Sequence, residues 1–141
     1  MRIVGLDLGA KRIGVAAADD RTQVAVPITV LAAGHDQLAA ISRLLDEQGA
    51  DEVVIGLPLS MTGAVGPQAE QALQVVDELR RRLSIPVYTW DERLTTVQAS
   101  RNQLPGHRSG RRSEGDKGRR DAIAAAIMLQ AFLDSRRSVR A

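Results

Sequence analysis

The sequence predicts an α/β protein: one five-stranded mixed sheet with helices on both of its faces. Short apolar runs typical of strands crowd the first quarter of the chain. Further on, two more such runs alternate with segments whose apolar residues follow helical spacing. This order of elements indicates a hairpin or meander that continues into βα units, which is a layered α/β arrangement.

Five runs are expected to form the sheet: 2–8, 13–18, 24–31, 53–57 and 86–90. The first two are separated by a short turn, so they are expected to form a hairpin. Pro27 lies within the third run, and proline fits an edge strand better than a central one. The fourth run is apolar throughout, as is typical of a strand that is buried on both faces.

Four helices are expected: between Asp36 and Gly49, from Pro67 to Leu83, from about Leu94 to Gln103, and from about Lys117 to Ser135. The stretch 105–115 is rich in Gly, Ser and Arg and is expected to be mobile. With 141 residues the chain has the usual size of one domain. We therefore expect a single domain over residues 1–135 and a frayed tail over residues 136–141.

The composition excludes several classes of protein. Apolar residues make up 44% and charged residues 26%, which is ordinary for a globular domain and unlike a disordered chain. No run of apolar residues approaches the length of a membrane span, and no signal peptide is recognisable. The absence of cysteine excludes disulfides, a thiolate nucleophile and a cysteine zinc site. A cytoplasmic protein is expected.

In open α/β sheets, ligands bind outside the carboxyl ends of the strands, and acidic residues are expected at this edge. Asp7 lies near the end of the first strand, Asp91 and Glu92 follow the fifth, and Asp121 opens the apolar final helix. Converging carboxylates repel one another unless a cation lies between them, and Mg²⁺ or Mn²⁺ suits oxygen ligands. Such ions can activate water for hydrolysis of a phosphodiester.

Each acidic position also has a structural interpretation. Gly5 and Gly9 share the face of Asp7 and leave room beside it, but they can equally serve turn and packing geometry while Asp7 pairs with Lys11 or Arg12. Asp121 can likewise lie in the first helical turn, stabilised there by the helix dipole and neighbouring cations. The residues alone leave these alternatives open.

Basic residues are concentrated between positions 101 and 120, where seven of them accompany two acidic residues, although the net charge of the whole chain is only +2. Such a stretch is either a patch that contacts phosphates or a solvated mobile loop. With three aromatic residues in the chain, a platform that stacks single-stranded bases is not expected. His35 and His107 are expected to be solvated surface residues.

Four sequence blocks, spread in order over nearly the whole chain, resemble the YqgF/RuvX family. They are GLDLG at 5–9 with KRIGVA at 11–16, GLPLSMTG at 56–63 with GPQA at 66–69, DERLTT at 91–96, and DAIAAAIMLQ at 121–130. The resemblance implies a ribonuclease H-like fold and a metal-dependent nuclease. This family is described as the nuclease that matures the 5′ end of the small-subunit ribosomal RNA precursor, and also as Holliday-junction-resolvase-like.

The resemblance also implies an acidic triad of Asp7, Glu92 and Asp121 that holds Mg²⁺ or Mn²⁺. Strand alternation does not decide between Asp91 and Glu92, which point to opposite sides of an extended backbone. The family pattern favours Glu92, and Asp91 would then cap the following helix or pair with Arg93.

The expected substrate is structured RNA, in particular the precursor of 16S ribosomal RNA. The residues expected to contact phosphates are Lys11, Arg12, Arg93, Arg108, Arg111, Arg112 and Lys117. One alternative is a resolvase of four-way DNA junctions, which would need a dimer, and another is an RNA-binding module without catalysis. An actin-like ATP-binding protein would need two lobes, whereas this length supplies one. Whether the protein is a monomer or a homodimer is left open.

Overall fold

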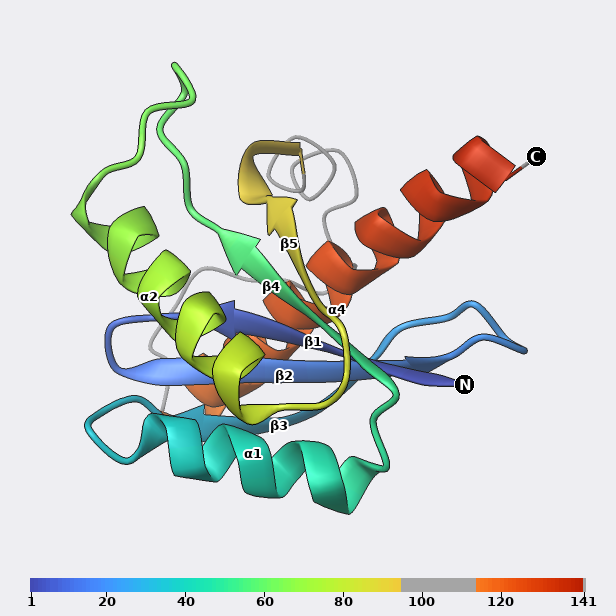
Figure 1. Cartoon of the computed structure of the whole chain (residues 1–141), viewed down its shortest axis with the longest axis horizontal. Helices are drawn as coiled ribbons and strands as arrows, with labels where there is room; N and C mark the ends of the chain where they lie inside the picture. Colours follow the sequence, from blue (N-terminus) through green and yellow to red (C-terminus); the bar gives the residue numbers. More distant parts are fainter. Residues whose placement is uncertain (95–113, 141) are drawn as a thin grey trace.

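The computed structural model describes residues 1–94 and 114–140, which form one sheet covered by helices (Figure 1). The strands are β1 (Arg2–Leu8), β2 (Arg12–Asp19), β3 (Val26–Ala32), β4 (Glu52–Leu57) and β5 (Val87–Asp91). The helices are α1 (Gln37–Gln48), α2 (Pro67–Arg82) and α4 (Glu114–Arg140). All five expected strands are present, which confirms the predicted α/β class.

The sheet is mixed, with strand order β3-β2-β1-β4-β5. Strands β1, β2 and β3 form an antiparallel meander, and β4 and β5 add to β1 in parallel. Strand β3 is therefore an edge strand, as Pro27 predicted, and β4 lies inside the sheet. The parallel strands β1, β4 and β5 end at a common edge, which is where the acidic residues were expected to meet.

Helices α1 and α2 cover one face of the sheet, and α4 covers the other (Figure 1). Side chains of the first core alternate along the strands, with Leu6, Val15 and Ile55 fully buried beneath α1 and α2. Helix α1 ends where expected, because Gly49 adopts a left-handed conformation with φ of 62°. Both faces of the sheet are covered by helices, which confirms the prediction.

The second core lies between α4 and the sheet, and its packing is unusually close. Alanines make up much of the inner side of α4, and Ala125 is fully buried. A Cβ on Gly5 would lie 3.0 Å from the Cβ of Leu129, and a Cβ on Gly14 would overlap the backbone carbonyl oxygen of Asp121. The helix therefore rests directly on the backbone of β1 and β2, which only glycine at these positions permits.

Helix α4 is longer than predicted at both ends. It begins at Glu114, before the expected start at Lys117, and it continues to Arg140. Residues 136–140, at the start of the expected tail, belong to this helix, and Arg136 is anchored to the sheet. Its guanidinium donates two hydrogen bonds, of 3.0 and 2.8 Å, to the carboxylate of buried Glu52. It also lies 4.9 Å from the ring centre of Tyr88.

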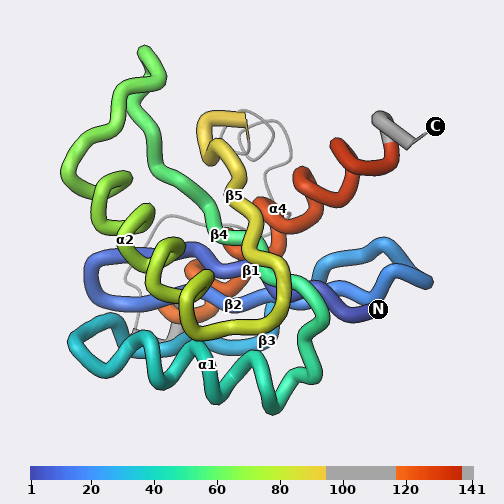
Figure 2. Tube along the Cα trace, viewed as in Figure 1, coloured from blue at the N-terminus to red at the C-terminus, as the bar shows by residue number. Residues whose placement is uncertain are grey.

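Figure 2 shows α4 passing obliquely behind the sheet, with its C-terminal end on the side where β1 begins. None of the helices in the described part of the chain is both long and apolar enough to cross a membrane. Most of the helix expected at 94–103 lies outside the described residues, although Glu92, Arg93 and Leu94 are already helical.

We predict that Gly14→Ala lowers the free energy of unfolding by at least about 1–3 kcal/mol, because the added methyl group has no room beneath the backbone of α4. Denaturant unfolding followed by circular dichroism measures this change. Gly118→Ala is the matched control within α4, since its Cβ would meet nothing closer than 3.6 Å. The control should gain up to about 1 kcal/mol from helix propensity. Equal stability of Gly14→Ala and the wild type would contradict the close packing.

Candidate active site

Asp7 lies near the carboxyl end of β1, on the face covered by α4, between two glycines of the neighbouring strands. It is the register partner of Gly14 on β2. On the other side, Leu6 pairs with Ile55 of the parallel strand β4. Asp7 and Gly56 each follow that pair, so Gly56 lies beside Asp7. A carboxylate flanked by two glycines has no side chain of either neighbouring strand against it. This leaves room for other groups to approach Asp7.

Glu92 fills the space on one side of Asp7. It follows β5 directly, and its side chain crosses Gly56, where a Cβ would overlap the Glu92 carboxyl group. The Glu92 and Asp7 carboxyls share a hydrogen bond. The structure thus brings together two of the three acidic residues of the expected triad.

The carboxyl pair binds a proton strongly. Burial, the hydrogen bond to Asp7 and the negative charge of Asp7 together raise the pKa of Glu92 to about 9. At neutral pH, Glu92 is therefore protonated, at the position where a cation was expected from the sequence.

Asp121 approaches from the opposite side, over Gly14, but its carboxylate is paired with a cation. Its Oδ2 accepts a hydrogen bond of 2.6 Å from Nε of Arg12, and both side chains are about one-third exposed. Because α4 begins at Glu114, Asp121 lies in the third turn, so the interpretation as a first-turn residue was wrong. Within the part of the chain that the structure describes, no three acidic or histidine side chains are close enough to hold a metal.

Asp91 is excluded from the carboxyl pair by the alternation of β5, in which its neighbour Trp90 packs against α4. It accepts hydrogen bonds of 3.0 Å from the backbone N–H of Arg93 and of 2.9 Å from the Arg93 Nε. These bonds lower the pKa of Asp91. Asp91 both caps the helical segment and pairs with Arg93, so the two expected alternatives occur together.

Arg93 also connects the end of β5 to the preceding loop, because its Nη1 donates to the carbonyl of Met61 over 3.2 Å. Two of the arginines expected to contact phosphates, Arg12 and Arg93, are thus engaged by carboxylates in this structure. Lys11 is exposed in the turn between β1 and β2. Lys117 precedes Asp121 by one helical turn and so lies on the same side of α4.

Three of the expected phosphate contacts, Arg108, Arg111 and Arg112, lie outside the described residues, as does His107. His35 is on the surface, with its side chain 95% exposed. The surface position expected for His35 is confirmed.

Sequence reasoning missed Gly14 and Gly56, the two glycines that make room around Asp7. The sequence predicted instead that Gly5 and Gly9, which flank Asp7 along its own strand, would leave this room. The available signal was a glycine inside each of two apolar strand segments, which often marks a close approach of backbone or ligand.

Comparison with known proteins agrees with the resemblance seen in the sequence. A family model described as "RuvX: Holliday junction resolvase" matches residues 1–135. A relative from Desulforudis audaxviator is 39% identical, with 99% of each chain covered. Another from Caldanaerobacter subterraneus is 40% identical, with 98% of this chain and 99% of the relative covered. Both carry the name "Putative pre-16S rRNA nuclease".

Solved structures show the same architecture at low identity. RuvC from Thermus thermophilus in complex with a Holliday junction substrate matches with a TM-score of 0.58 at 15% identity, covering 96% of this chain and 95% of RuvC. The fowlpox virus resolvase in complex with Holliday junction DNA also gives a TM-score of 0.58, at 10% identity, with 96% of this chain and 98% of the resolvase covered. These matches confirm the ribonuclease H-like fold, and the family match shows that this chain belongs to the RuvX family of nucleases.

Proposed function

We propose that this protein is a divalent-metal-dependent nuclease that processes the 5′ end of the 16S ribosomal RNA precursor in the cytoplasm. The observation that carries the proposal is the Asp7–Glu92 carboxyl pair at the carboxyl edge of the sheet, where the Glu92 side chain crosses Gly56 and Gly14 leaves room on the other side of Asp7. The names of the full-length relatives support RNA processing as the setting.

The donor set fits a hard cation. Asp7, Glu92 and Asp121 offer only carboxylate oxygens, which are the ligands that Mg²⁺ and Mn²⁺ prefer. When bound, such a cation supplies an activated water and stabilises the leaving oxygen of the phosphodiester. Gly14 and Gly56 are a second indication of fit, because they leave room beside Asp7 for other groups to approach it.

Holding the cation would require two changes in these residues. Glu92 would release its proton to water, so that both members of the carboxyl pair are ionised. Asp121 would hold the cation in place of the Arg12 guanidinium, and Arg12 would then be available to a phosphate of the substrate. Lys11 in the β1–β2 turn and Lys117 in α4 lie towards the same edge, and the basic residues Arg108, Arg111 and Arg112 are proposed to extend the contact with the phosphate backbone.

A resolvase of four-way DNA junctions is the second candidate. The description of the matching family favours it, as does the ribonuclease H-like fold shared with RuvC. It differs from the first candidate in needing two active sites in a dimer to cut a junction symmetrically. A third candidate, an RNA-binding module without turnover, has no observation in its favour beyond the fold.

Cleavage of labelled substrates distinguishes these candidates. We expect metal-dependent cutting of a 16S ribosomal RNA precursor and no symmetric cutting of a four-way DNA junction in a parallel reaction. EDTA should abolish the activity. Symmetric cutting of the junction would favour the resolvase, and binding of RNA without cleavage by the folded protein would favour the non-catalytic module.

Asp7→Asn should reduce the rate of cleavage more than about 100-fold, because it removes a direct ligand of the cation. Loss of a residue that only hydrogen-bonds to a ligand already costs about 10–100-fold. Single-turnover cleavage of the RNA precursor measures the effect, with thermal unfolding as a check of folding. Asp46→Asn is the matched control, since Asp46 is exposed in the last turn of α1, on the face of the sheet opposite to α4. Wild-type cleavage by Asp7→Asn would refute the assignment.

Glu92→Gln should be more stable than the wild type at pH 8 in EDTA. The pKa of Glu92 is about 9 in the folded protein against an ordinary value of 4.5, so the folded state binds more protons than the unfolded state between these values. The contribution of Glu92 to stability is therefore present below about pH 4.5 and is lost as the pH rises towards 9. Glutamine keeps a donor to Asp7 and cannot ionise.

Denaturant unfolding at pH 5 and pH 8 measures this difference. We expect the advantage of Glu92→Gln over the wild type to grow with pH, and Mg²⁺ to stabilise the wild type more than the variant. A difference that does not change with pH would show that Glu92 is ionised in the metal-free protein.

A further inference from the structure

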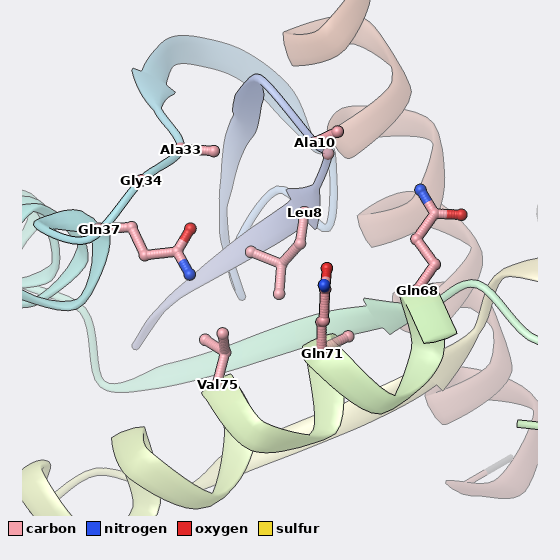
Figure 3. Close-up of a pocket in the computed structure, with 10 residues that line it drawn as sticks. Leu8, Ala10, Ala33, Gly34, Gln37, Gln68, Gln71 and Val75 are labelled. Carbon is pink, nitrogen blue, oxygen red and sulfur yellow. The ribbon is translucent and has the colours of Figure 1, made fainter. Parts of the chain in front are cut away.

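A cavity of about 250 Å³ lies between the first residue of α1 and the first half of α2, beside Leu8 at the end of β1 (Figure 3). We call it the glutamine cavity. Its lining residues are Leu8, Gly9, Ala10, Ala33, Gly34, Gln37, Gln68, Gln71, Ala72 and Val75. This volume is below the ~300–1,000 Å³ typical of sites for drug-sized ligands, so the cavity suits a single small ring system.

The lining combines an apolar floor with amide groups. In Figure 3, Gln37 from α1 and Gln71 from α2 extend towards the space beside Leu8, with Val75 below it. Within the described part of the chain, no protein group is hydrogen-bonded to the side-chain amides of half-buried Gln37 and of Gln68 and Gln71, which are exposed to solvent. Each can therefore offer a donor and an acceptor to a bound molecule.

The charge of the lining narrows the chemistry of the occupant. Among the described residues, none in the lining carries a charge, although more than a quarter of the residues in the chain do. A described lining without lysine or arginine disfavours a phosphate group, and one without carboxylates disfavours a cation. A neutral, flat molecule with both donors and acceptors on its edge matches this lining, and nucleobases have this character.

The position of the cavity ties it to the carboxyl pair. Leu8, in its floor, is the residue after Asp7, and strand alternation directs the two side chains to opposite faces of the sheet. The turn from Gly9 to Lys11 runs around the edge of the sheet between them, and the carbonyl of Lys11 accepts a bond of 3.0 Å from Ala33 at the cavity rim. Exposed Lys11 thus stands between the cavity and the carboxyl edge.

We propose that the glutamine cavity binds one unpaired nucleobase of the nucleic-acid substrate, next to the phosphodiester that is cut. The proposal rests on the nuclease function proposed above and adds a specificity determinant to it. The base enters on the α1–α2 side, its backbone passes over the turn at Lys11, and the adjoining phosphate reaches Asp7 on the α4 side. A nucleotide held in a duplex cannot follow this path, so the enzyme selects a strand that is unpaired at the cut.

Two measurements test the inference, one of binding and one of cleavage. In the first, the side-chain amide NMR signals of Gln37 and Gln71 are followed in EDTA while a short single-stranded RNA, or the DNA of the same sequence, is added. We expect both signals to shift with the intact strand and to stay in place with a strand of abasic nucleotides. Amide signals that do not respond to the intact RNA or DNA would overturn the proposal.

In the second, cleavage is compared between an RNA precursor and the same RNA with one abasic nucleotide beside the cut. For the wild type we expect kcat/KM to fall about 10–100-fold, the size of effect produced by leaving polar groups of a site unpaired. The ratio should approach one in the Gln37→Leu/Gln71→Leu double variant. Gln74→Leu is the matched control, because Gln74 is an exposed glutamine of α2 that does not line the cavity.

The outcomes separate this inference from the proposed function. If the wild type cuts no substrate and the amide signals still respond to the intact strand, the nuclease proposal fails and the base-binding cavity stands. If the wild type cuts the abasic RNA as well as the normal RNA, or the double variant retains the full penalty, the nuclease proposal stands and the cavity does not bind the base.

Discussion

The contact between the backbone of α4 and Gly14 is the constraint on which both the core and the site depend. It brings the helix onto the sheet at Gly14 without an intervening side chain, and alanines such as Ala122 and Ala125 are buried on the inner face of α4 beside it. The same contact places the backbone of Asp121 over the register partner of Asp7. The absence of a side chain at Gly14 therefore determines both how closely α4 packs on the sheet and where Asp121 lies. A change in the packing of α4 would also move Asp121.

Local patterns were sufficient to predict most of the fold. Apolar runs located all five strands, Pro27 predicted the edge strand, and Gly49 ended α1. The ends of α4 were not predictable in this way. Its first turn lies in a stretch rich in glycine and charge that looks like a loop, and its last turns depend on Arg136 meeting Glu52, a partner 84 positions away.

The site was predictable in its residue types and less so in its pairings. The closeness of Asp7 to the end of β5 was predictable, because the ends of parallel strands meet at one edge of a sheet. The capping of the next helix by Asp91 was predictable because it is a local interaction. The bond between Arg12 and Asp121 joins residues 109 positions apart, and the crossing of Glu92 over Gly56 depends on the register of two strands. Single-sequence patterns carry no information on such register.

In the structure, the three acidic residues are engaged in two separate ways: burial and the neighbouring Asp7 raise the pKa of Glu92, and Arg12 forms an ion pair with Asp121. Both interactions would have to change for the three carboxylates to hold one cation together. The arrangement therefore couples loss of a proton, release of an arginine and cation binding at one end of β1. Because strand alternation turns Leu8 to the opposite face, the same strand end can present its carboxylate to the phosphate and its apolar side to a base. In the two proposals, Asp7 thus serves the cleavage reaction and the adjacent Leu8 serves the recognition of the base.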